Sequence, residues 1–252
     1  EISANPDIFA PVFGLYVSRD GSDTADGSAA NPVRTINKAI SLADRNRGFE
    51  GCTIYIGKGR YFENVTIENK KDITIENYAD ERVVITGGIR LDNDDFSVVS
   101  DSEVLQRFGK EASGKLLQLD LSKYLSEMKS PRSVLGADGY YRLYNGSGKQ
   151  TLARYPNAEY AVVRMVNEDD PEEGYYIEGT DRVKQWQDIS GLYMSSYISA
   201  PYNMHKSNVA ETDKETGIFK LTKNVKISEV GINAALYNVS EELDIPGEWY
   251  ID

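Results

Sequence analysis

Residues 15–88 read LYVSRDGSDTADGSAANPVRTINKAISLADRNRGFEGCTIYIGKGRYFENVTIENKKDITIENYADERVVITGG, and this stretch decides the fold. A strand leads into an Asp/Gly/Ser loop and then into an amphipathic helix, which is predicted over residues 33–46. Short runs rich in β-branched residues follow, each ended by Gly, Asn, Asp or Lys. They predict strands at 53–56, 64–67, 73–76, 83–86 and 96–100. Strands this short and frequent indicate stacked coils of a solenoid.

Several motifs occur in this stretch in a fixed order. They are Tyr16-Val17-Ser18, Asp20-Gly21-Ser22, Asn31-Pro32, Thr35-Ile36, Ala39-Ile40, Thr53-Ile54-Tyr55-Ile56, Gly59-Arg60-Tyr61 and Glu63-Asn64-Val65-Thr66-Ile67. Together they resemble the N-terminal cap and first coils of the right-handed parallel β-helix proteins, a superfamily of pectate-lyase-like enzymes, glycoside hydrolases and polysaccharide lyases. The resemblance implies a solenoid plugged by the helix, and a polysaccharide as the substrate class.

The composition favours a globular protein that acts on a neutral partner. The 252 residues suffice for one large domain or two modest ones, and 40% of them are hydrophobic. The net charge of -12 argues against binding to nucleic acid or to an anionic membrane, because phosphate contacts require an excess of Lys and Arg. A neutral plant or bacterial cell-wall glycan suits this charge better than a polyanion. No apolar run approaches the ~20 residues that span a bilayer.

The single cysteine and the first residue of the chain bear on where in or outside the cell the protein is expected. Cys52 is the single cysteine, so the chain has no internal disulfide and no cysteine-based metal site. It opens an apolar strand, which favours a buried structural thiol over a nucleophile. The chain begins at Glu1 without a Met, which is typical of a processed protein. We therefore expect a secreted or cell-surface bacterial protein.

The pattern changes after residue 100. Longer alternating runs follow, and Asn145-Gly146-Ser147-Gly148 between two of them predicts a β-hairpin. The predicted fold is mostly β, with the helix cap and first coils of a parallel β-helix followed by an inserted antiparallel sandwich or barrel. The expected divisions are a lead-in segment at 1–14, the cap and coils at 15–102, the inserted domain at 103–236 and a return segment at 237–252.

The resemblance extends into this region. Leu152-Ala153-Arg154-Tyr155-Pro156-Asn157 is similar to a segment in the inserted β domain of some β-helix glycoside hydrolases, and residues 238–252 are similar to their return to the solenoid. Those proteins continue for many coils. The resemblance therefore implies downstream coils of the same polypeptide as a partner, with Asp252 as an artificial boundary or a cleavage point.

No catalytic residue is predicted within the chain. In the resembled enzymes the catalytic groups lie on later coils of the solenoid. Glycoside hydrolysis requires two carboxylates that flank one bond. Glu241, Glu242, Asp244 and Glu248 cluster in sequence, and one of them with a raised pKa would act as an acid. A solvated acidic turn is the favoured interpretation.

Aromatic side chains supply the candidate glycan contacts, because their flat apolar faces and polar edges suit sugar rings. The candidates are Trp186, Tyr193, Tyr197, Tyr202 and His205. Trp186 lies among polar neighbours and is either a stacking platform or half-buried. Predicted strands carry Tyr140, Tyr141, Tyr193 and Tyr197, and because side chains alternate along a strand, only some of these tyrosines can face outward. His205 lies either on the sugar-facing rim with Tyr202 or in an ordinary surface loop.

No cofactor is required by these observations, although one loop suggests calcium. Asp20, Asp23 and Asp26 occur at a spacing of three in a Gly-rich loop, where oxygen ligands can surround a hard cation. The spacing differs from that of an EF-hand, and the loop is also an ordinary turn of the cap.

These observations lead to one main hypothesis and two alternatives. The main hypothesis is the N-terminal, non-catalytic part of a secreted polysaccharide-degrading β-helix enzyme, a glycoside hydrolase before a lyase, which helps to form a glycan cleft. The first alternative is an autonomous carbohydrate-binding module, which requires outward-facing aromatic rings. The second is a segment of a cell-surface adhesin or scaffold.

Overall fold

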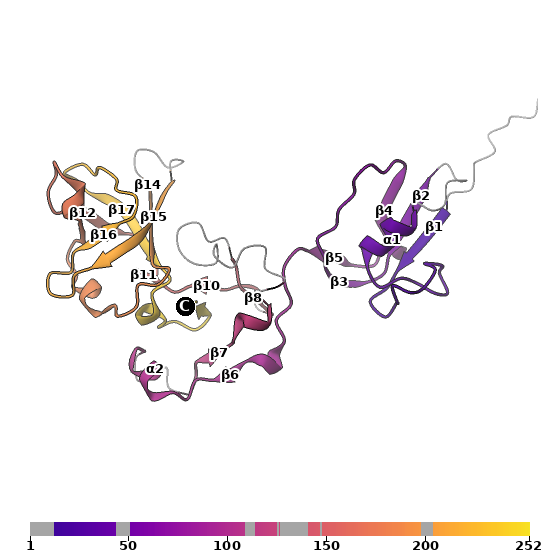
Figure 1. The fold of residues 1–252 in the computed structure, drawn as a ribbon, viewed down its shortest axis with the longest axis horizontal. Helices are drawn as coiled ribbons and strands as arrows, with labels where there is room; N and C mark the ends of the chain where they lie inside the picture. Colours follow the sequence, from indigo (N-terminus) through magenta and orange to yellow (C-terminus); the bar gives the residue numbers. More distant parts are fainter. Residues whose placement is uncertain are drawn as a thin grey trace, which may run out of the picture. The chain divides into compact units, whose positions relative to one another are not determined.

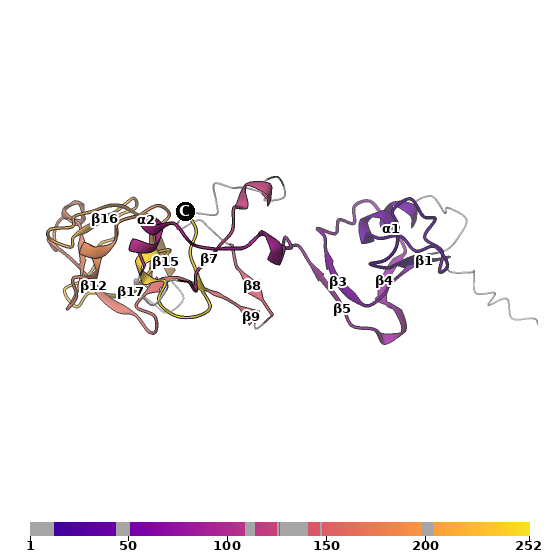
Figure 2. The same cartoon turned by 90° about the horizontal axis from the view of Figure 1, so that it is seen from below.

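A computed structural model describes residues 13–43, 51–108, 114–124, 126, 141–146, 148–197 and 204–252. The chain divides into two compact units at Leu91 and Asp92, about ten residues before the expected boundary. Each unit is mostly β-structure with few helices, as predicted (Figures 1 and 2). Within the described ranges, no helix has the length and apolar character that crossing a membrane demands.

Parallel strands dominate the first unit. Its elements are β1 (Phe13–Val17), α1 (Ile36–Ala43), β2 (Cys52–Ile56), β3 (Gly59–Phe62), β4 (Ile73–Asn77) and β5 (Val83–Thr86). Strands β1, β2 and β4 form one parallel ladder, and β3 with β5 forms another. Such ladders are the local element of a parallel β-helix, but the described residues do not complete a solenoid.

The core of the first unit lies between helix α1 and the strands. Ile36, Ala39 and Ile40 recur at helical spacing and are buried, which confirms the predicted apolar stripe. The helix begins at Ile36 rather than at Val33, because Val33 forms a parallel bridge with Val17. Cys52 is buried and unpaired in this core, as expected.

Two carboxylates satisfy the amides at the start of α1. Asp23 Oδ1 accepts hydrogen bonds from the amides of Arg34 and Thr35 at 3.0 and 2.9 Å. Glu63 Oε1, from the end of β3, accepts one from the Ile36 amide at 3.0 Å. The first amides of a helix lack intrahelical partners and carry partial positive charge, so both contacts stabilise the helix start.

Residues 64–67 do not form the predicted strand. The side-chain amide of Asn37 donates through Nδ2 to the Asn64 carbonyl at 3.1 Å, and the Thr66 backbone N–H donates to Asn37 Oδ1 at 3.3 Å. A helix side chain therefore takes backbone groups that a strand ladder would otherwise use, a competition that sequence periodicity does not reveal.

Antiparallel strands dominate the second unit. Its helix is α2 (Ser102–Gln106), and its strands are β6 (Ser97–Val98), β7 (Leu117–Gln118), β8 (Tyr144–Asn145), β9 (Gly148–Lys149), β10 (Thr151–Leu152), β11 (Arg154–Tyr155), β12 (Ala161–Met165), β13 (Tyr175–Ile177), β14 (Tyr193–Tyr197), β15 (Met204–Thr212), β16 (Phe219–Leu221), β17 (Ile232–Tyr237) and β18 (Glu248–Trp249). The predicted hairpin is confirmed, since Asn145 pairs with Gly148.

A closed antiparallel barrel forms the centre of this unit. Its strand order is β12-β13-β16-β15-β14-β17, and β17 closes it by pairing with both β12 and β14. This confirms the barrel alternative of the prediction. The interior is packed with apolar side chains, with Tyr175, Met194, Phe219 and Leu236 fully buried or nearly so.

The expected return segment, residues 237–252, belongs to the second unit. Val239 and Ser240 are fully buried, and Thr151 pairs in parallel with Glu248. A short 3₁₀ helix, Ser240–Glu242, carries two of its acidic residues, Glu241 and Glu242. The segment is thus a packed part of the barrel unit.

Candidate functional site

Tyrosines gather on the outside of the barrel where β14 and β17 pair. Met194 and Ser196 are fully buried, so the alternation of a strand turns Tyr193 and Tyr197 outward. Tyr193 pairs with Tyr237 of β17, and their rings stack with centroids 5.2 Å apart and planes 13° from parallel. Two strands thus supply one continuous aromatic surface.

Arg154 extends this surface across β17. It pairs with Tyr237 from the opposite edge of that strand. Its guanidinium carbon lies 5.1 Å from the ring centre of Tyr237 and 5.8 Å from that of Tyr160. Arg154 also donates to the Glu159 carbonyl, which holds the guanidinium in place. Cation–π contacts of this length fix the two rings relative to each other.

Tyr160 and Tyr197 are the accessible members of the group. They meet edge to face, with centroids 6.3 Å apart, and their exposed fractions are 44% and 39%. Lys206 of β15 lies over the Tyr193 ring at 5.7 Å. We call this surface the tyrosine face; its residues are Arg154, Tyr160, Tyr193, Tyr197, Lys206 and Tyr237.

The phenol groups of Tyr193 and Tyr237 stay neutral at physiological pH. Burial raises the pKa of Tyr193 to about 12. Burial also raises the pKa of Tyr237, against the opposing effect of the Arg154 charge. A neutral phenol both donates and accepts hydrogen bonds, as a sugar hydroxyl requires of its partner.

The chemistry of the face is that of binding. Exposed rings stack on apolar sugar faces, and their hydroxyl edges bind polar groups. None of its six residues is acidic, whereas glycoside hydrolysis requires a pair of carboxylates. The tyrosine face can therefore hold a glycan but lacks the groups that would cleave one.

The stacking interpretation of Trp186 is wrong. Its side chain is fully buried, and its ring meets that of Tyr155 edge on, with centroids 6.3 Å apart. The indole N–H donates to Glu242 Oε1 at 2.8 Å. Trp186 is therefore a core residue whose polar edge is satisfied by the return segment.

His205 is not part of the tyrosine face. His205 pairs with Ser196, an inward-facing residue, and so points toward the end of the barrel interior. Within the described part of the chain, neither His205 Nε2 nor Ser196 Oγ has a hydrogen-bond partner. Tyr202 lies outside the described residues.

The acidic return segment is an anchored structure, which corrects the solvated-turn interpretation for Glu242. That side chain is 1% exposed and pairs with Arg182 at 3.1 Å as well as with Trp186. Burial raises the pKa of Glu242, and the bonds to Trp186 and Arg182 only partly oppose it. Burial likewise raises the pKa of Glu248. Glu242 faces these partners inside the protein, where no substrate bond is accessible.

Arg107 secures the same segment from the α2 side. Its Nη2 donates to Asp188 at 3.0 Å, to Ser240 at 2.9 Å and to the Tyr250 hydroxyl at 2.9 Å. These contacts join positions up to 143 residues apart in the sequence. They fix the return segment to the barrel unit.

The aspartates of the calcium hypothesis have other roles. Asp23 caps α1, and its Oδ2 accepts the Thr35 hydroxyl at 2.9 Å. Asp26 accepts the Ser28 amide at 2.9 Å, which lowers the pKa of its carboxyl. Asp20 is exposed nearby. In the described ranges no three acidic, histidine or cysteine side chains are arranged to hold a metal ion.

Sequence reasoning missed four members of the tyrosine face, namely Arg154, Tyr160, Lys206 and Tyr237. Arg154 and Tyr237 are 83 positions apart in the sequence, and strand pairing with β17 brings them together with Tyr193. Tyr160 precedes a run of alternating apolar residues, so its outward direction was readable. The residues that surround Tyr160 could not be predicted, because their proximity depends on which strands pair.

Comparisons with known proteins support the fold. No described protein family matches the chain. Over 77 residues it is 38% identical to the uncharacterized protein YwoF of Bacillus subtilis (strain 168), a match that covers 29% of this chain and 15% of that protein. A solved structure titled "Glycoside hydrolase" matches with a TM-score of 0.68 and 20% identity. That match covers 96% of this chain and 42% of the other, so the chain spans less than half of either protein.

Proposed function

We propose that this chain is the N-terminal part of a longer carbohydrate-active protein, in which the tyrosine face of the barrel binds a glycan. The observation that carries the proposal is the exposed pair Tyr160 and Tyr197, held by stacked and cationic neighbours on a rigid sheet. The likeness in fold to a glycoside hydrolase, over 96% of the chain, supports the same class of partner.

The first unit supports a β-helix in the parent protein. Cys52 pairs with Ile73, 21 positions later, and Gly59 pairs with Val83, 24 positions later. Offsets of this size are typical of solenoid repeats. Within the described residues β4 and β5 each pair with a strand on one edge only. The strands of a further coil could therefore pair with the open edges of β4 and β5.

The proposed glycan is neutral. The net charge of -12 disfavours a polyanionic chain in general. On the face itself, the charges of Arg154 and Lys206 lie against tyrosine rings. The proposal places the protein outside a bacterial cell, where cell-wall and plant polysaccharides occur. Hydrolysis, or less favourably lyase chemistry, then belongs to residues outside this chain.

A second candidate function is an autonomous carbohydrate-binding module. It is favoured by one observation: every residue of the tyrosine face lies within the second compact unit. The coding sequence beyond Asp252 separates the two candidates. Further coils with paired acidic residues favour the enzyme, whereas a linker or anchoring segment favours a binding or adhesive role.

Affinity electrophoresis tests the proposal. The 252-residue chain migrates through gels that contain arabinoxylan, xyloglucan, galactomannan, mixed-linkage β-glucan or, as the polyanionic control, pectate. We expect retardation by at least one neutral polysaccharide and a weaker effect of pectate. Unchanged migration in all five gels contradicts a glycan-binding role for this chain.

A further inference from the structure

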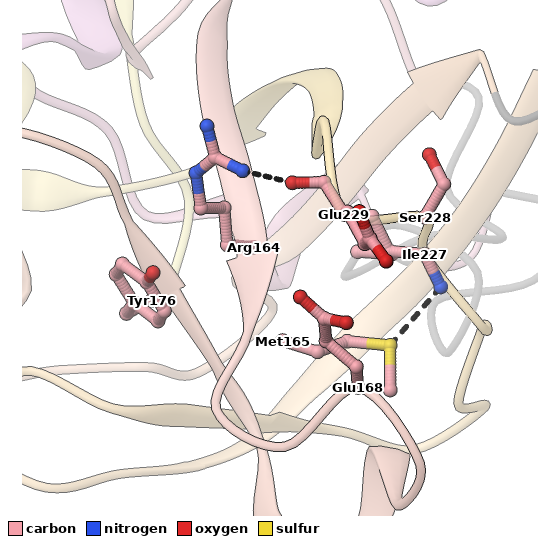
Figure 3. Close-up of a pocket in the computed structure, with 7 residues that line it drawn as sticks. All are labelled: Arg164, Met165, Glu168, Tyr176, Ile227, Ser228 and Glu229. Carbon is pink, nitrogen blue, oxygen red and sulfur yellow. Dashed lines mark hydrogen bonds between the residues drawn. The ribbon is translucent and has the colours of Figure 1, made fainter.

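A small polar pocket lies on the outside of β12 and β13 (Figure 3). Its volume is about 200 Å³, and it is lined by Arg164, Met165, Glu168, Tyr176, Ile227, Ser228 and Glu229. This volume is below the ~300–1,000 Å³ of pockets that hold drug-sized ligands. The pocket therefore suits one small ring rather than an extended molecule.

A fixed guanidinium forms one side of the pocket. Arg164 binds both carboxylate oxygens of Glu178, at 3.1 and 3.2 Å, and donates to the Glu229 carbonyl. These contacts hold the planar fork of the Arg164 guanidinium in position. An arginine carries five N–H groups, more than these contacts use.

Acceptors and an aromatic ring complete the lining. Figure 3 shows the Glu168 carboxylate between Arg164 and the Ile227–Glu229 segment. Glu168 and Ser228 are exposed at the pocket, so both side chains are accessible to a ligand. Tyr176 pairs across the strands with Arg164 and is 37% exposed. Donors, acceptors and a ring face around one small volume suit a hydroxyl-rich ring.

Tyr160 of the tyrosine face directly precedes β12, and Arg164 of the pocket lies on that strand. Val163 and Met165 are buried, so Tyr160 and Arg164 share the outward side of the β12 segment. Four residues of strand span about 13 Å at ~3.3 Å each. We infer that the pocket is a second subsite, which binds one sugar ring of the same neutral glycan that lies on the tyrosine face. This inference rests on the proposed function.

Calorimetry with short and long oligosaccharides tests it. The probes are xylobiose and xylohexaose, with cellobiose and cellohexaose as a second pair. The pocket variants are Glu168→Gln and Tyr176→Ala, and the face variant is Tyr160→Ala. Glu215→Gln, an exposed acid elsewhere in the barrel unit, is the matched control. Thermal melting of each variant establishes that it is folded.

We expect the pocket variants to bind a hexaose about tenfold more weakly and the biose unchanged, because only the longer chain reaches both subsites. Tyr160→Ala is expected to weaken the binding of both the hexaose and the biose. Equal hexaose affinity in the folded pocket variants and the wild type overturns the second subsite, while the proposed function survives if Tyr160→Ala still weakens binding. If the wild type binds none of the four sugars, the subsite inference fails, whereas the proposed function survives if a neutral polysaccharide retards the wild type in affinity electrophoresis.

Discussion

The indole N–H of Trp186 donates to the carboxylate of Glu242, 2.8 Å away and 56 positions later in the sequence. Both side chains are buried, and Arg182 pairs with the same carboxylate from the barrel side. This contact, with the Arg107 cluster, makes residues 237–252 part of the barrel unit. It also removes Trp186 from the set of residues that can meet a ligand.

Replacing Trp186 tests this assignment. Trp186→Phe is expected to lower the free energy of unfolding of the barrel unit by about 1–3 kcal/mol, because it leaves a buried carboxylate without one of its donors. Urea unfolding followed by circular dichroism measures the change. Trp249→Phe is the matched control, since its Nε1 is buried without a partner among the described residues and its loss costs less. Equal effects of the two changes would contradict the account, as would weaker glycan binding by folded Trp186→Phe.

The pH dependence of stability follows from Glu242. Its folded-state pKa lies above its ordinary value, so the folded state holds a proton that the unfolded state releases first. This contribution to stability is therefore present at low pH and is lost as pH rises through the unfolded and then the folded pKa. Glu242→Gln removes this dependence.

We expect the stability of the wild type relative to Glu242→Gln to fall as the pH rises above the ordinary pKa of a glutamic acid, because the folded-state pKa is raised. Urea titrations followed by tryptophan fluorescence measure it, because both tryptophans lie in the second unit. A relative stability that rises with pH would mean that the ionised carboxylate is the favoured form, which would reverse the assigned direction.

Local chemistry explains which parts of the fold were predictable. The stripe of Ile36, Ala39 and Ile40 and the hairpin at Asn145 depend only on nearby residues, and both are present. The burial of Trp186 was not predictable, because its polar neighbours in sequence hide a partner at Glu242. The Tyr160 and Tyr197 pair was likewise hidden, since it requires the barrel to close through β17.

The carboxylates at the start of α1 give a further prediction. Asp23→Ala is expected to cost about 1 kcal/mol, as the loss of an N-terminal cap does. Amide hydrogen exchange of residues 36–43 should accelerate about fivefold if these amides exchange through local opening. Asp20→Ala, in the same loop but exposed, is the control. Identical exchange in the two variants would show that Asp23 does not hold the helix start.

The central claim is that the tyrosine face binds a glycan, and one titration tests it most directly. The double variant Tyr160→Ala/Tyr197→Ala is compared by calorimetry with the wild type and with Tyr144→Ala, an exposed tyrosine of β8. The ligand is the neutral polysaccharide that retards the wild type most. The account predicts at least a tenfold loss of affinity, ~1.4 kcal/mol, for the folded double variant and none for Tyr144→Ala. Undiminished affinity of the double variant would contradict it.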